Sequence, residues 1–319
     1  MMETAESAPA SRFLATKKPS LGQTLKPFVS QVPKPFVLRA PKPCLACALL
    51  LCMLGPARAA NHLQVASFST VLTEIARQVG GDRVTVFGLV RPGVDPHEYE
   101  PTPADLRKVS EARVILTSGR QLEDYLGKLQ QASGGKADLL PVGDRLTTSA
   151  IHWWNSVGNV EEATRIVRDE LSKVDPADQS IFEKNASDYL VRLDDLNRWI
   201  RRKVAELPRD RRRLVTSHNA FRALGHAYGF TIFAIEGTST ETEPSNRQVA
   251  KLIDQIKSQG VKAIFVEQTQ NPKVTQEIAR ETGAKIGGAL YADGLGTGEA
   301  STYAGMMKHN VSTIVNALK

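Results

Sequence analysis

The stretch PADQSIFEKNASDYLVRLDDLNRWIRRKVAEL, residues 176–207, divides this 319-residue chain into two parts of similar character. Its apolar residues recur every three or four positions, at Phe182, Ala186, Tyr189, Leu193, Leu196, Ile200, Val204 and Leu207. This spacing predicts one continuous amphipathic helix, which at ~1.5 Å per residue would be roughly 48 Å long. Since that length exceeds an ordinary crossover helix, we expect a strut that packs along two lobes.

Strands and helices alternate on both sides of this helix. Short apolar runs predict strands at 62–67, 84–90 and 113–119 before it, and at 213–217, 231–235 and 262–266 after it. Helical patterns lie between the strands, among them 70–79, which Ser69 can cap, and 103–111. Alternation with short connections is typical of parallel sheets covered on both faces, so the sequence predicts an α/β fold.

A short sequence recurs once in each part. Glu-Pro-Thr at 100–102 and Glu-Pro-Ser at 243–245 each precede a predicted helix and then a strand. The hydroxyl or the carboxylate of such a sequence is suited to a helix N-terminus. The repeat indicates two related lobes.

The net charge of +7 is concentrated in the first 60 residues, which hold eight Lys or Arg and two acids. The remaining residues carry 33 basic and 32 acidic groups. Because the charge is not spread over the fold, we expect no nucleic-acid partner. The composition, 41% hydrophobic and 24% charged, is that of a folded protein.

The leader predicts export. Its basic region precedes an apolar run at 44–54 and then Ala-Arg-Ala-Ala at 57–60, which is typical of a secretory signal peptide and too short for a membrane span. We therefore expect a periplasmic protein whose mature chain begins near Ala60 or Asn61. A buried N-terminal helix is one alternative. A lipid anchor on Cys47 or Cys52 is another, although neither cysteine follows the usual small residues.

Three histidines and one aspartate occupy loops where a ligand would be expected. His97 follows the second predicted strand, His152 begins the run HWW, and His218 lies where a strand gives way to a helix. In open α/β sheets the ligand crevice lies outside the carboxyl ends of the strands. Asp293 lies in LYADGLG, whose glycines permit close backbone approach.

These four residue types favour a metal site. Imidazole suits Zn, Cu, Fe and Ni, and three imidazoles with one carboxylate can close a four-coordinate shell around Zn²⁺. All three cysteines lie in the leader, so thiolate ligands are excluded beyond it. His62, His226 and His309 lack a comparable context, and we expect them to lie away from the site.

Six motifs, in order, carry a resemblance to a known family: DPHEYEPTP (95–103), LRKVSEARVILTSG (106–119), HWW (152–154), VTSHNAFRALGHAYG (215–229), AIFVEQTQNPK (263–273) and LYADGLG (290–296). Together they resemble the periplasmic solute-binding proteins that serve zinc and manganese ABC importers. The resemblance implies two lobes, each with a parallel four-stranded sheet, joined by one long rigid helix, with a metal held between them. It places the ligands on His97, His152, His218 and Asp293.

The departures from that family bear on the site. Ala150 and Ile151 stand where Asp-Pro is usual, which leaves His152 the least supported ligand. Asn219 replaces the usual aspartate after His218, and no long His/Asp-rich loop occurs between 133 and 151. Manganese-type members often have glutamate where His218 stands, which favours zinc. We expect Glu267 to contact the site through a hydrogen bond, with binding of the ion as the alternative.

The sequence thus predicts a leader at 1–60, an N-terminal metal-binding lobe at 61–175, a linker helix at 176–208 and a C-terminal metal-binding lobe at 209–319. We expect a monomeric receptor of high affinity that delivers Zn²⁺ to the membrane permease of an ABC importer. Four protein ligands leave no open position, so we do not expect an enzyme. The alternatives are a Mn²⁺ or iron receptor, a secreted zinc hydrolase with Asp293 or Glu267 as base, and an adhesin.

Overall fold

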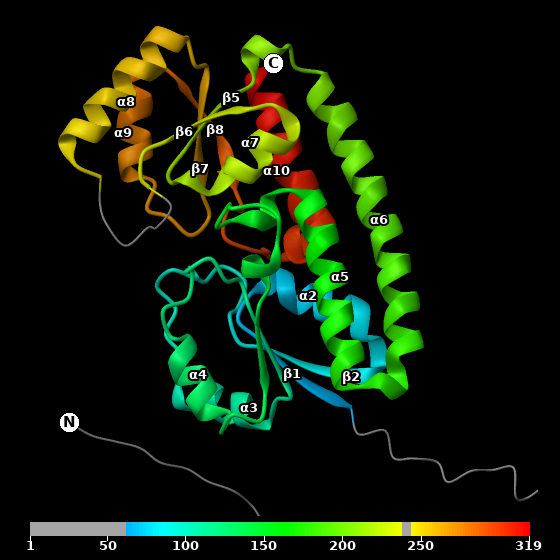
Figure 1. Cartoon of the computed structure of the whole chain (residues 1–319). Coiled ribbons are helices and arrows are strands. Elements are labelled where there is room, and N and C mark those ends of the chain that lie inside the picture. The colour runs from blue at the N-terminus through cyan, green and yellow to red at the C-terminus, as the bar shows by residue number, and fades with distance from the viewer. Residues whose placement is uncertain (1–61, 238–243) are drawn as a thin grey trace, which may run out of the picture. The chain divides into compact units, whose positions relative to one another are not determined.

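The computed structural model describes residues 62–237 and 244–319 (Figure 1). The predicted signal peptide and the possible lipid anchor lie outside these residues. Within the described ranges, no helix combines the length and the apolar character needed to cross a membrane. The described chain contains two parallel sheets of four strands each, as predicted.

The first sheet belongs to the N-terminal lobe. Its strands are β1 (Leu63–Ser67), β2 (Val84–Gly88), β3 (Val114–Thr117) and β4 (Asp138–Pro141), in the order β2-β1-β3-β4. The helices between them are α2 (Thr70–Gly80), α3 (Pro103–Glu111) and α4 (Leu126–Ala132). Every residue of β3 is buried, which is expected for a central strand covered on both faces.

The second sheet belongs to the C-terminal lobe and repeats the same order. Its strands are β5 (Arg213–Thr216), β6 (Thr231–Ala234), β7 (Ala263–Glu267) and β8 (Lys285–Leu290), in the order β6-β5-β7-β8. Its helices are α7 (Arg222–Tyr228), α8 (Asn246–Gln259), α9 (Lys273–Thr282) and α10 (Tyr303–Leu318). In each sheet the second strand along the chain lies on one side of the first strand, and the third lies on the other side. The strand order therefore reverses beside the first strand, and ligands commonly bind at such a switch point.

The long helix connects the two lobes. After α5 (Val157–Val174) and a 3-10 turn at Pro176–Asp178, α6 runs from Gln179 to Ala205, slightly shorter than predicted. All eight apolar residues of the predicted stripe are buried. The buried stripe of the helix packs against α2, α5 and α10 (Figure 1). Asn185 bonds to the Val79 carbonyl of α2, and Asn197 accepts a bond from Tyr228 of α7.

The predicted helix starts are confirmed. Ser69 caps α2, and α3 spans the predicted residues. Both repeated sequences end in a capping box, in which Thr102 pairs with Asp105 and Ser245 pairs with Gln248. The six predicted strands are present, with ends that differ from the predicted ones by at most two residues, and β4 and β8 escaped prediction.

Candidate metal centre

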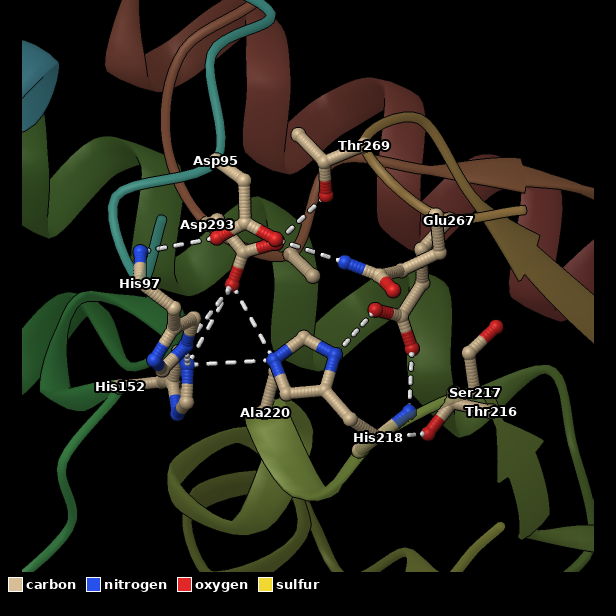
Figure 2. Close-up of polar contacts among 12 residues, drawn as sticks. Asp95, His97, His152, Thr216, Ser217, His218, Ala220, Glu267, Thr269 and Asp293 are labelled. Atoms are coloured by element: carbon tan, nitrogen blue, oxygen red, sulfur yellow. Dashed lines mark hydrogen bonds and ion pairs between the residues drawn. The ribbon is translucent and has the colours of Figure 1, made fainter. Parts of the chain in front are cut away.

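The four predicted ligand residues lie in loops of the two lobes, and their side chains point toward one another (Figure 2). His97 lies in the segment after β2, and His218 directly follows β5. Asp293 follows β8, and His152 begins the segment that leads into α5. Each lobe therefore supplies two of the four side chains.

The structure brings these four side chains together. The Nε2 atom of His152 lies 3.0 Å from that of His97 and 3.2 Å from that of His218. The Oδ1 atom of Asp293 lies 3.1, 3.3 and 3.9 Å from the Nε2 atoms of His218, His152 and His97. A tetrahedral ion with bonds of about 2.0–2.1 Å separates its ligand atoms by roughly 3.3 Å. The cluster therefore has the dimensions of one ion's coordination shell, and it includes His152 despite the unusual residues before it.

The cluster is buried and carries an unsatisfied acceptor. The four side chains are between 0% and 5% exposed. Among the described residues, Asp293 Oδ1 is buried without a hydrogen-bond partner. Burial alone would raise the pKa of Asp293, but its contacts with His152 and His218 hold that pKa well below its usual range. An ionised carboxylate oxygen in this setting is suited to a cation.

The histidines differ in their protonation. Burial lowers the pKa of His152, which favours a neutral ring. Burial also acts to lower the pKa of His218, but bonds to Asp293 and Glu267 and the charges of both carboxylates raise it to about 10. In the absence of an ion, His218 is therefore the ring that holds a proton beside Asp293.

Second contacts orient the atoms that face the centre. Glu267 bonds both to His218 Nδ1 and, at 3.1 Å, to its backbone N–H, which leaves Nε2 facing the cluster. Thr269 Oγ1 donates to Asp293 Oδ2 at 2.8 Å, which leaves Oδ1 facing the cluster. Such contacts fix the orientation of metal ligands. The predicted hydrogen bond at Glu267 is confirmed, with the carboxylate as acceptor, and Glu267 lies outside the group of four converging side chains.

The residues that anchor the Asp293 loop are not predicted from the sequence. Trp154 Nε1 and Asn155 Nδ2 donate to the Ala292 carbonyl at 2.9 and 3.0 Å, and the Leu295 N–H donates to Thr70 Oγ1 at 2.8 Å. Gly294 lies so close to Thr70 that an added Cβ would be 2.4 Å from its hydroxyl. The predicted close backbone approach is thus present. The HWW motif contains Trp154 and could have indicated that this residue lies close to the site.

The other three histidines lie apart from the cluster, as expected. His62 is exposed, and His309 bonds to the Ala289 carbonyl. His226 lines a separate polar cavity together with Arg222 of the same helix. In the described residues the converging group contains only His97, His152, His218 and Asp293.

Comparisons with known proteins find a metal-uptake family and relatives named for the metals that they bind. Residues 65–317 match the family described as ZnuA, zinc-uptake complex component A, periplasmic. The chain is 35% identical over 278 residues to the manganese-binding lipoprotein MntA of Bacillus subtilis, covering 81% of this chain and 90% of MntA. It is 30% identical over 271 residues to the iron-binding protein YfeA of Yersinia pestis, covering 81% and 87%.

The third relative is known from both sequence and structure. The zinc-binding protein TroA of Treponema pallidum is 32% identical over 265 residues, covering 78% of this chain and 86% of TroA. A solved structure of TroA superposes with a TM-score of 0.77 at 29% identity, covering 81% of this chain and 99% of that chain. The three relatives are thus named for three different metals.

Proposed function

The chain belongs to the ZnuA family of metal-binding solute-binding proteins, and from this premise we propose that its ligand is Zn²⁺, held by His97, His152, His218 and Asp293. As a member of the family it is a metal receptor of an ABC importer and not an enzyme. The hydrolase alternative is thereby excluded. We also propose that the protein delivers this ion to the membrane permease of an ABC importer.

The donor set is the observation that supports zinc. Three imidazole nitrogens and one carboxylate oxygen converge within 4.8 Å of one another. Carboxylate, carbonyl and water ligands suit manganese, whereas imidazole suits zinc, copper, iron and nickel. A manganese or iron receptor is the alternative, and the names of MntA and YfeA support it.

The geometry also supports capture and retention of a cation. Asp293 supplies negative charge in a buried site where its Oδ1 faces the Nε2 atoms of His152 and His218. Glu267 holds the Nδ1 side of His218, so that an ion can take the place of the proton on Nε2. Four protein ligands leave no coordination position for a reacting water, which suits a receptor.

The relatives' names also bear on location and assembly. MntA is named a lipoprotein, which supports a lipid anchor at Cys47 or Cys52 over the free form favoured by the sequence analysis. We propose export through the signal in residues 1–60 and retention in the cell envelope. We also propose that the protein is a monomer, with an N-terminal lobe at 61–175, a linker helix at 176–208 and a C-terminal lobe at 209–319.

Metal analysis of the purified protein tests the zinc proposal. Protein stripped with a chelator and then offered equimolar Zn²⁺, Mn²⁺ and Fe²⁺ under anaerobic conditions should retain one zinc per chain. His152→Ala should lose that zinc, whereas His226→Ala, a histidine outside the cluster, should keep it. Retention of manganese or iron in preference to zinc would overturn the choice of metal.

A further inference from the structure

The four ligand positions are not held equally firmly. The Asp293 loop is bonded on both sides to the N-terminal lobe, through Ala292 and Leu295. The side chains of His152 and His218 are at most 1% exposed. The His97 side chain is 5% exposed, but it lies in a segment at 89–102 without helix or strand, where Val94 is 40% exposed. The position of His97 therefore depends on individual contacts of that segment.

One carboxylate links this segment to the opposite lobe. Asp95 Oδ1 accepts a bond from the His97 backbone N–H at 2.9 Å. Asp95 Oδ2 accepts a bond from Gln270 Nε2 at 2.8 Å. Because an ionised carboxylate can only accept, the amide of Gln270 must donate. A single side chain thus joins the backbone of an N-terminal ligand to the loop after β7.

Gln270 directly follows Thr269, which also bonds to a residue of the centre. Its neighbour Thr269 bonds to Asp293, so two consecutive residues hold ligand segments of different lobes. The neighbouring Gln268 is exposed and makes no side-chain hydrogen bond in the described structure. Of the two glutamines in this loop, Gln270 is therefore the one whose side chain bonds to a residue of the centre's surroundings.

We infer that Gln270 is a positioning residue: through Asp95 it holds His97 in the centre, and loss of this bond releases His97 first and speeds dissociation of the metal. The inference rests on the proposed metal-binding function. None of the four ligand atoms changes when Gln270 is replaced, so capture of the ion should be affected much less than its retention. Loss of a hydrogen bond to a charged group predicts dissociation roughly tenfold faster.

Stopped-flow kinetics of the purified protein test the inference. Release of Zn²⁺ is followed after mixing with excess chelator, and capture is followed with a fluorescent zinc indicator. Gln270→Ala should release zinc roughly tenfold faster and capture it at nearly the wild-type rate. Gln270→Glu should release it faster still, because two carboxylates then face each other. Gln268→Ala, the matched control, should behave as wild type.

A double variant separates positioning from general loosening of the loop. In Asp95→Asn with Gln270→Glu, the new asparagine amide can donate to the new glutamate while its oxygen still accepts the His97 N–H. This variant should restore slow release. Unrestored release, or equal release rates in wild type and Gln270→Ala, would overturn the inference. A wild-type protein that retains no zinc would instead overturn the proposed function, and the inference with it.

Discussion

At the scale of single residues, the centre depends on the atoms of its ligands that face away from the cluster and bond to neighbouring side chains. Glu267 accepts two bonds from His218, one from the ring and one from the backbone. A glutamine has only one acceptor oxygen, so Glu267→Gln should lose one of these contacts and let the ring turn. We expect zinc affinity to fall about 10–100-fold, as for other residues that orient metal ligands.

Competition titration with a zinc chelator measures this effect. Glu277→Gln provides the control, because Glu277 is an exposed carboxylate on α9. An unchanged affinity in Glu267→Gln would show that the ring of His218 is held by other means.

A second buried carboxylate lies away from the metal centre and predicts a pH effect on stability. Burial raises the pKa of Glu123 to about 7 from its ordinary value of 4.5, although the N–H groups of Ser118 and Gly119 act in the opposite direction. The folded state therefore favours the protonated form. The stabilising effect is complete below about pH 4.5 and is lost as the pH rises through about 7, roughly 3 kcal/mol in all.

Urea denaturation of metal-free protein between pH 4.5 and 8 tests this expectation against Glu123→Gln, which cannot ionise. The free energy of unfolding of the variant, relative to wild type, should increase as the pH rises. Parallel curves would mean that Glu123 titrates alike in the folded and unfolded chain.

The sequence could locate the candidate ligands and the contact of Glu267, but not the other residues that orient them. His97, His218 and Asp293 follow predicted strands or a glycine-rich loop, so their chemistry and position are visible in the chain. The contacts of Thr269 and Gln270 depend instead on where the loop after β7 lies, and the pairing of β7 with β8 helps to set that position. That pairing is irregular between Ile264 and Phe265, and no periodicity reveals such an irregularity.

At the scale of elements, the two missed strands are both at sheet edges. β4 (DLLP) lies at the edge of the first sheet and ends in proline, which cannot donate to a ladder. β8 (KIGGAL) lies at the edge of the second sheet and contains two glycines, which have low strand propensity. A strand at a sheet edge pairs with only one neighbour, so it tolerates proline and glycine. These residues also weaken the strand pattern in the sequence, which explains why β4 and β8 escaped prediction.

The short turn after His152 offers a prediction at the same scale. Trp154 Nε1 bonds across the lobes to the Ala292 carbonyl, next to Asp293, whereas Trp153 Nε1 bonds within its own lobe to the Ser118 carbonyl at 3.0 Å. Phenylalanine at either position removes one indole donor and should cost about 1 kcal/mol of stability. Only Trp154→Phe should also weaken zinc binding, because it loosens the Asp293 loop.

Chemical denaturation and zinc titration of both variants provide the comparison. Equal zinc affinities for Trp154→Phe and Trp153→Phe would contradict a role for the cross-lobe bond in holding Asp293.

At the scale of the whole folded part, the two lobes share one apolar core. The largest buried cluster includes residues of β1, α2, α5, α6, α7 and α10. Glu74 of α2 adds a polar link, since its carboxylate accepts bonds from the Tyr303 N–H of α10 and the Tyr189 hydroxyl of α6. Separation of the lobes would therefore expose apolar surface and break these bonds.

This arrangement predicts that metal binding changes the dimensions of the protein very little. A hinge needs a few residues that can absorb a large change in φ and ψ, but α5 and α6 are packed helices joined by a short turn at Pro176–Asp178. Small-angle scattering of protein beginning at residue 61 should give a radius of gyration of roughly 18 Å. The values with and without Zn²⁺ should agree within error. A clear decrease on adding zinc would mean that the lobes close on the ion.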